Sequence, residues 1–193
     1  SIILSFYNEE LNIKNSVSKL TEILREIKDI DYEIVYVNDC STDRSLELLL
    51  EENKKNEKIK IVNLSRRFGH MPGIMAGLKC CTGDAAIYID IDLQDPPELI
   101  KEMVNCWIKE NYDVVFTTRE KRKDSFLMGI LNKIGYSILE KTTYINITKD
   151  SGDFRLINRK VINEYVKFRE LNPFFRFIVD FIKIKKKQIF YSR

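Results

Sequence analysis

Three aspartates stand close together where an apolar run ends. The stretch 90–95, with the sequence D-I-D-L-Q-D, begins at the end of a predicted strand over residues 85–90. In extended backbone Asp90 and Asp92 face the same side, about 6–7 Å apart along the chain, and Gln94 continues that side with a neutral oxygen. Oxygen ligands of this kind suit Mg²⁺ or Mn²⁺ rather than zinc. The spacing therefore predicts a divalent metal site made by Asp90, Asp92 and Gln94.

The place of these carboxylates favours a ligand over a plain acidic loop. Carboxylates gathered at the end of a buried strand repel one another, and each is costly to desolvate. A divalent ion together with a diphosphate removes that conflict. A bare D-x-D more often belongs to a solvated loop that caps a helix, but the longer run D-I-D-L-Q-D-P-P after an apolar strand is far more specific.

A second polar cluster, N-D-C-S-T-D at residues 38–43, follows another predicted strand. The carboxylate of Asp39 can accept hydrogen bonds from a nucleobase or a ribose there. Ser41 or Thr42 can equally cap the next helix, and both roles can hold at once. Other nucleotide motifs are absent from the sequence, since it contains neither a G-x-G-x-x-G after the first strand nor a G-x-x-x-x-G-K-[ST]. For His70, the chain's one histidine, we expect a structural or surface role.

Strand-like and helix-like segments alternate through the first 118 residues. The predicted strands cover residues 1–6, 32–37, 59–64, 85–90 and 112–118, and the predicted helices follow Asn8, follow residues 41–43, and cover 71–82 and 97–110. Farther on we expect helices at 124–141, 160–168 and 174–182 and a strand at 153–157. This order predicts an α/β fold with a mostly parallel central sheet and helices on both faces. Such sheets bind ligands at the carboxyl ends of their strands, near the point where the strand order reverses.

Composition and charge narrow the classes of protein. The 193 residues suffice for one domain with a sizeable core. Residues 1–96 carry a net charge of −5 and residues 97–193 one of +8. The acidic half suits a metal site; the basic half suits either a phosphate or membrane-surface partner or a solvated lysine face. The four cysteines form no C-x-x-C pair, so we expect neither a structural zinc site nor a disulfide framework.

Seven short motifs together carry a resemblance to a known family. The chain resembles family 2 glycosyltransferases of the GT-A fold, and within them the branch of dolichyl-phosphate mannose synthases and bacterial polyprenyl-phosphate glycosyltransferases. The motifs lie at 7–10, 37–43, 64–70, 76–78, 83–84, 90–97 and 151–156. The long D-x-D-L-Q-D-P-P-E-L run with G-D-F-R-L is specific to this branch, whereas Y-N-E and D-x-S-T-D occur across the family. The resemblance implies one GT-A catalytic domain over 1–193, with a nucleotide-binding half at 1–118 and an acceptor-binding half at 119–193. The chain starts inside an apolar run and stops near where relatives continue, so we expect a piece of a longer protein.

The resemblance also implies roles for residues on the donor side. Tyr7, Glu9 and Asp39 would contact the base of a UDP- or GDP-sugar. Asp90 would lie against its ribose and diphosphate, and Asp92 and Gln94 would hold the Mg²⁺ or Mn²⁺.

On the acceptor side the resemblance assigns three further residues. Asp153 would sit beside the sugar and the acceptor as a candidate base, so that Asp153 and Asp92 form the catalytic pair. Arg119 and Arg122 would meet the acceptor's phosphate.

The chain departs from the family pattern at four places. Ser5-Phe6 replaces a proline common in the first strand, and Cys40 stands where glycine is usual. Met128-Gly129 occupies a stretch that often carries basic residues, which weakens the case for an acceptor phosphate. The Q-x-x-R-W signature of processive polysaccharide synthases is absent from the sequence.

The expected reaction is an inverting hexosyl transfer from the nucleotide-sugar to a polyprenyl (undecaprenyl or dolichyl) phosphate. A phosphate monoester with a second pKa of about 6 is mostly dianionic at neutral pH, so it can attack without a base. Such an enzyme would work in the cytoplasm at the inner face of the membrane; we expect no nucleic-acid partner and leave a homo-oligomer open. One alternative is a soluble family 2 transferase that acts on a cell-surface glycan and needs Asp153 as a true base. A further alternative is a non-catalytic nucleotide-binding or scaffold domain.

Overall fold

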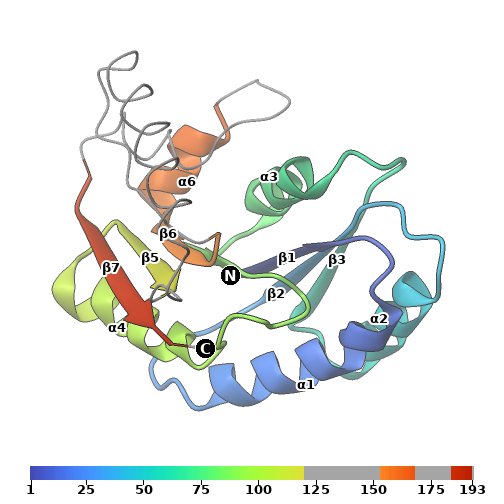
Figure 1. Cartoon of the computed structure of the whole chain (residues 1–193), viewed down its shortest axis with the longest axis horizontal. Coiled ribbons are helices and arrows are strands. Elements are labelled where there is room, and N and C mark those ends of the chain that lie inside the picture. The colour runs from blue at the N-terminus through green and yellow to red at the C-terminus, as the bar shows by residue number, and fades with distance from the viewer. Residues whose placement is uncertain (120–152, 168–183, 193) are drawn as a thin grey trace, which may run out of the picture.

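The computed structural model describes residues 1–119, 153–167 and 184–192 (Figure 1). These residues form one seven-stranded sheet with the order β3-β2-β1-β4-β6-β5-β7. Every strand pair in it is parallel except those of β6, which runs antiparallel to both β4 and β5. The strands are β1 (Ile2–Phe6), β2 (Ile34–Asn38), β3 (Ile59–Asn63), β4 (Ala85–Tyr88), β5 (Val114–Arg119), β6 (Arg155–Asn158) and β7 (Lys186–Tyr191).

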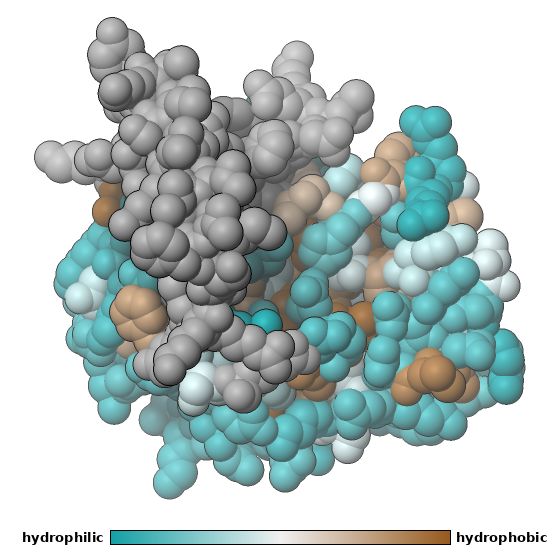
Figure 2. Space-filling view, viewed as in Figure 1, coloured by the Kyte–Doolittle hydropathy of each residue, from teal (hydrophilic) through white to brown (hydrophobic). Residues whose placement is uncertain are grey.

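Helices cover both faces of this sheet, as the sequence predicts (Figure 1). On one face α1 (Glu10–Arg25), α2 (Ser45–Lys55) and α4 (Leu99–Glu110) pack on the side chains of Ile2, Leu4 and Phe6. On the other face α3 (His70–Cys80) and α6 (Arg159–Tyr165) pack on the side chains that alternate with these, such as Ile3. Because successive side chains of a strand point to opposite faces of the sheet, β1 contributes to the hydrophobic core on each face. Figure 2 shows a mainly hydrophilic surface over α1, whose apolar stripe is turned inward.

The strand order reverses between β1 and β4. The chain runs from β1 to β2 and β3 on one side and then returns to place β4 on the other side of β1. Through the parallel pair Ile3↔Tyr88 the carboxyl end of β4 lies beside β1, and both strands run toward the same edge of the sheet. The antiparallel pair Tyr88↔Arg155 brings the amino end of β6 to the same edge.

Two glycines let α3 lie directly on the sheet. A Cβ atom at Gly73 would stand 2.0 Å from Ser5 Oγ, and one at Gly77 would stand 2.4 Å from Ile3 Cγ2. Contacts that short do not occur between real side chains, so a glycine is needed at both positions. Both glycines therefore serve the close packing of α3 on β1.

The sequence missed one strand and misplaced the end of another. β7 was not predicted, because its sequence K-K-Q-I-F-Y opens with charged residues and pairs only with β5 at the sheet edge. β4 ends at Tyr88, two residues before the predicted end. The helices expected at 124–141 and 174–182 lie outside the described residues. Within the described ranges, the structure contains no helix long and apolar enough to cross a membrane.

Candidate active site

A cavity of about 230 Å³ opens where the sheet order reverses. It is lined by Ser5, Phe6, Tyr7, Glu9, Asp39, Arg67, Gly69, His70, Asp90, Ile91 and Asp92. A larger cavity of about 590 Å³ lies at the opposite, amino ends of the strands, near Glu33 and Trp107. We take the smaller one as the site, because parallel sheets bind ligands at the carboxyl ends of their strands.

The Asp39 carboxylate is buried, and each of its oxygens accepts one backbone N–H. Asp39 is only 2% exposed. Its Oδ1 accepts the Phe68 N–H at 2.7 Å, and its Oδ2 accepts the Gly69 N–H at 2.8 Å. Gly69 has a φ of +100°, a conformation that side chains rarely adopt. Asp39 therefore fixes the segment that leads into α3, and a second lone pair on each oxygen remains for a ligand.

A flat aromatic surface lies beside Asp39. The guanidinium carbon of Arg67 is 4.0 Å from the centre of the Tyr7 ring, within cation–π distance. Glu9 lines the same cavity, and its Oε2 accepts a hydrogen bond of 2.6 Å from Asn12 Nδ2. The structure thus brings together Tyr7, Glu9 and Asp39, the three residues predicted to contact the base.

The loops after β1 and β2 cap each other's helices. Asn8 Oδ1 accepts the Thr42 N–H at 2.8 Å. Asp43 accepts the Glu10 N–H at 3.1 Å through Oδ2 and the Ser45 N–H at 3.0 Å through Oδ1. The cap on α2 thus comes from Asp43 in the same loop rather than from Ser41 or Thr42, and the same carboxylate also holds the first N–H of α1. The two loops bond to each other because neighbouring parallel strands end side by side.

The acidic stretch after β4 is a turn and not an extension of the strand. The Leu93 N–H donates to the Asp90 carbonyl oxygen at 3.2 Å, and Leu93 has a φ of +49°. Asp92 Oδ1 accepts the Gln94 N–H at 3.1 Å, the local bond by which an aspartate favours a turn. The predicted same-face geometry along a strand was therefore wrong, although Asp90 and Asp92 still line one cavity.

Asp153 approaches this turn from β6. β6 begins at Arg155, opposite Tyr88 at the end of β4, and Asp153, two residues before β6, is near enough to act electrostatically on Asp90. The pKa of Asp90 is raised above its usual value, chiefly by burial. His70 opposes that rise, and the carboxylates of Asp92, Asp153 and Asp95 add to it. Three carboxylates and one imidazole thus act together on Asp90 at this turn.

The donor set at this turn fits Mg²⁺ or Mn²⁺. Magnesium is usually held by one or two carboxylates together with substrate phosphates and water. Asp90 and Asp92 offer two such carboxylates, and across the described ranges no three acidic, His or Cys side chains form a complete metal site on their own. Gln94, the third predicted ligand, is exposed and does not line the cavity.

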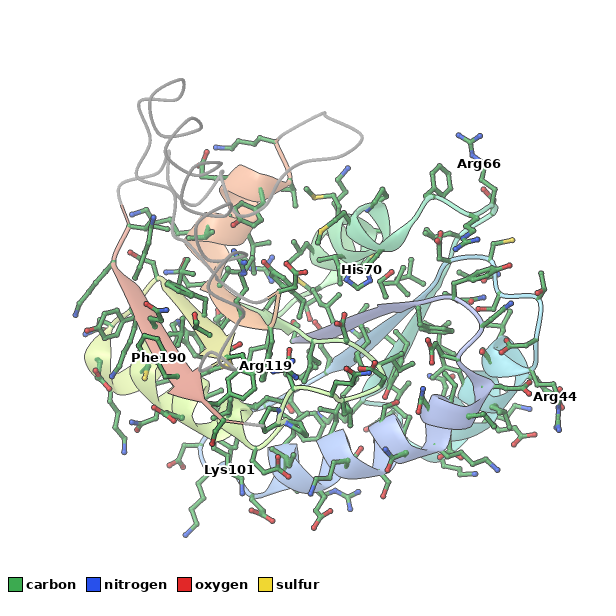
Figure 3. The ribbon with its side chains drawn as sticks, in the orientation of Figure 1. Arg44, Arg66, His70, Lys101, Arg119 and Phe190 are labelled. Atoms are coloured by element: carbon green, nitrogen blue, oxygen red, sulfur yellow. The ribbon has the colours of Figure 1, made fainter. Side chains whose placement is uncertain are left out.

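The predicted acceptor residues are placed only in part. Arg119 ends β5, exposed and outside the cavity lining, and it pairs in register with Tyr191 of β7 (Figure 3). The Tyr191 hydroxyl in turn donates a hydrogen bond to Asp95. Burial is the main cause that raises the pKa of Tyr191 to about 12, with the bond to Asp95 as the second cause. Arg122 lies outside the described residues.

Two residues of the site escaped sequence reasoning. His70 Nε2 lies 3.5 Å from Asp90 Oδ1, so this histidine belongs to the site and the expected structural or surface role was too narrow. Arg67 stacks on Tyr7. The sequence offered a signal, because both lie in the motif at 64–70, but the adjacency of β1 and β4 that brings His70 to Asp90 is a property of the fold.

The profile of glycosyl transferase family 2 matches residues 1–166 of the chain. The chain belongs to this family. Over its full length this family 2 domain is 43% identical to the uncharacterized glycosyltransferase YkcC of Bacillus subtilis, of which it covers 59%. The chain spans about three fifths of the length of the curated relatives it matches.

Solved structures share the fold at low sequence identity. The family 2 domain aligns in full with S. aureus TarS in complex with UDP, covering 60% of that chain at 16% identity and a TM-score of 0.65. It also aligns in full with mannosyltransferase PcManGT from Pyrobaculum calidifontis in complex with GDP-Man and Mn²⁺. There the coverage is 55% of that chain, the identity 14% and the TM-score 0.67. The α/β fold with its mostly parallel seven-stranded sheet is thus the one found in GT-A glycosyltransferases.

Proposed function

We propose that this domain is a metal-dependent inverting hexosyltransferase that uses a nucleotide-diphospho-sugar. One observation carries the proposal: a single cavity has Tyr7 and Asp39 among its lining residues and also the paired carboxylates of Asp90 and Asp92. An aromatic face with hydrogen-bond acceptors suits a nucleobase, and paired carboxylates suit a divalent ion on the diphosphate. The cavity therefore matches the chemical order of the donor from base to diphosphate.

One group of residues binds the nucleoside of the donor, and another holds the metal at its diphosphate. Tyr7, Glu9 and Asp39 hold the base and ribose, while Asp90 and Asp92 hold the metal, with Gln94 as a third ligand if its side chain turns inward. The metal, when bound, stabilises the negative charge that develops on the departing nucleotide. Support for a UDP- or GDP-sugar with Mn²⁺ comes from the TarS structure with UDP and the PcManGT structure with GDP-Man and Mn²⁺.

For the acceptor we propose a polyprenyl phosphate at the inner face of the membrane. The G-D-F-R-L run at 152–156 and the net positive charge of residues 97–193 support this choice. We assign residues 1–118 to the donor half and 119–193 to the acceptor half, where Arg119 and Arg122 contact the acceptor phosphate. A dianionic phosphate attacks the anomeric carbon directly, and Asp153 orients the reacting groups.

A glycan acceptor is the second candidate, and the placement of Asp153 favours it. Asp153 acts electrostatically on Asp90, which supports a place for its carboxylate near the reacting groups, where it can take a proton from an attacking hydroxyl. A phosphate acceptor needs no such step. Transfer measured with a polyprenyl phosphate and with a glycan, each across a range of pH, separates the two, because the glycan reaction alone requires an ionised base.

The metal role is tested by Asp92→Asn in the full-length protein. We expect turnover with Mn²⁺ and a nucleotide-sugar to fall roughly 100-fold or more, because an interaction that stabilises transition-state charge is lost. Asp84→Asn is the matched control, since Asp84 is exposed at the opposite end of the same strand. Unchanged turnover in Asp92→Asn would refute the metal role.

A further inference from the structure

One imidazole approaches the carboxylate at the centre of the site. His70 Nε2 lies 3.5 Å from Asp90 Oδ1, and both side chains line the cavity, 40% and 57% exposed. Figure 3 shows the His70 ring between α3 and β1. The remaining groups that act on Asp90 are the carboxylates of Asp92, Asp153 and Asp95, which repel it.

We propose that His70 is a positioning residue that holds one oxygen of Asp90 through Nε2–H and turns the other toward the bound metal and diphosphate. This inference rests on the proposed function. A neutral imidazole with its proton on Nε2 is sufficient, so no change of protonation is involved. Carboxylates that bind a metal are commonly oriented by such an outer hydrogen bond. The distance is longer than a good hydrogen bond, as is frequent before the ligand is present.

The backbone ahead of His70 is held in place by Asp39. The Asp39 carboxylate accepts the N–H groups of Phe68 and Gly69, the two residues that immediately precede His70. The positive φ of Gly69 then turns the chain into α3. The direction in which the His70 side chain leaves the backbone is therefore set by a buried group.

The helix that begins at His70, α3, is also fixed by direct contact with the sheet. Gly73 lies so close to Ser5 of β1 that no Cβ atom fits between them. Because β1 pairs with β4 at Ile3↔Tyr88, this contact also fixes α3 relative to the turn that carries Asp90. A side chain held from both directions at the mouth of a cavity is suited to positioning, since little further ordering is needed.

The test compares two substitutions of similar size in the full-length protein. His70→Gln keeps an N–H donor at the same reach, whereas His70→Leu has none. The affinity for Mn²⁺ in the presence of UDP or GDP is measured by electron paramagnetic resonance, and kcat and KM for sugar transfer are measured alongside. We expect His70→Leu to weaken Mn²⁺ binding by about 10- to 100-fold. We expect His70→Gln to retain it within a few-fold, with nucleotide binding in the absence of metal unchanged in both.

Two outcomes overturn the inference. Wild-type Mn²⁺ affinity in His70→Leu means that Asp90 needs no positioning by His70. An equal loss in both variants, with thermal stability maintained, means that the imidazole itself ligates the metal. Failure of the proposed function looks different, because the wild-type protein would then bind no Mn²⁺ with either nucleotide and Asp92→Asn would change nothing.

Discussion

Asp39 and Asp90 carry the same side chain at the ends of strands that flank β1, yet their surroundings are opposite. Asp39 is 2% exposed, and each of its oxygens accepts a backbone N–H. The Asp90 side chain is 57% exposed, and it faces His70 and other carboxylates. The first carboxylate is complete without a ligand and builds the site. The second faces other carboxylates, and we propose that a cation completes it.

The difference shows how a protein divides stability and function between like residues. A buried carboxylate that accepts two N–H groups is compensated for its lost hydration. The raised pKa of Asp90, due to burial and then to its acidic neighbours, means that its ionised form is disfavoured in the fold. Perturbed ionisation of this kind gathers at functional sites.

The contrast between Asp39 and Asp90 is tested most directly by Asp39→Ala. Two partly buried N–H groups, those of Phe68 and Gly69, then lose their acceptor, and each such loss is worth about 1 kcal/mol, the lower end of the range for buried donors. We expect the free energy of unfolding to fall by about 2 kcal/mol, measured by urea titration. Asp90→Ala, the control, should leave it unchanged or slightly raised, since repulsion is removed. Equal losses in the two variants would contradict the division of roles.

Unfolding measured at acidic pH extends this contrast to Glu33, a second carboxylate whose oxygens are bonded within the protein. Its own burial raises the pKa of Glu33, but the ion pair with Lys60 and the hydrogen bonds from Ser1 and Thr82 prevail and lower it to about 2 from 4.5. A depressed folded-state pKa gives stability that is present above pH 4.5 and is lost as the pH falls toward about 2. Asp90 acts in the opposite sense, because its folded-state pKa is raised above 3.8 and its penalty disappears on acidification.

The pH experiment measures urea unfolding of the wild type and of Glu33→Gln from pH 6 to pH 2.5. We expect the wild type to lose up to about 3 kcal/mol more than Glu33→Gln over this range. An equal loss of stability in the wild type and in Glu33→Gln would show that the partners of Glu33 do not lower its pKa. Asp90→Asn should remove the opposing contribution and make the acid loss steeper.

The smallest expected effect concerns Cys40, the neighbour of Asp39. Cys40 has a φ of +61°, in the left-handed region that disfavours L-residues by about 1–2 kcal/mol. Glycine relieves that strain but adds about 0.4–1 kcal/mol of freedom to the unfolded chain. We expect Cys40→Gly to raise the free energy of unfolding by about 0.5 kcal/mol, measured as a shift in melting temperature. Cys40→Ala keeps the strained backbone and should bring no gain.

The sequence predicted most of the fold because its strong patterns are local. The buried strands and the amphipathic helices before residue 119 lie within a few residues of their predicted positions. The predicted end of β4 was two residues too late, because the chain turns at residues 90–93 and the apolar residues there resemble a continuing strand. β7 carried no local signal, because Ile189 is its one buried residue and reaches the core only after the strand has paired with β5.

The sequence predicted which residues form the candidate site, but it did not predict the contacts between them. Tyr7, Glu9, Asp39, Asp90 and Asp92 do share one cavity. That Asp39 is already bonded, and that His70 meets Asp90, depends on strand adjacency and on the close approach of α3 to β1. Spacing along a chain does not reveal either fact.

The hydrogen bond from Tyr191 to Asp95 joins residues 96 positions apart. During synthesis, at about 5–20 residues per second, the acidic turn leaves the ribosome roughly 5–20 seconds before the strand that ties it down. Until β7 is synthesised, the turn lacks this anchor. The segment proposed to bind the metal therefore reaches its final shape only when the last strand of the sheet is in place.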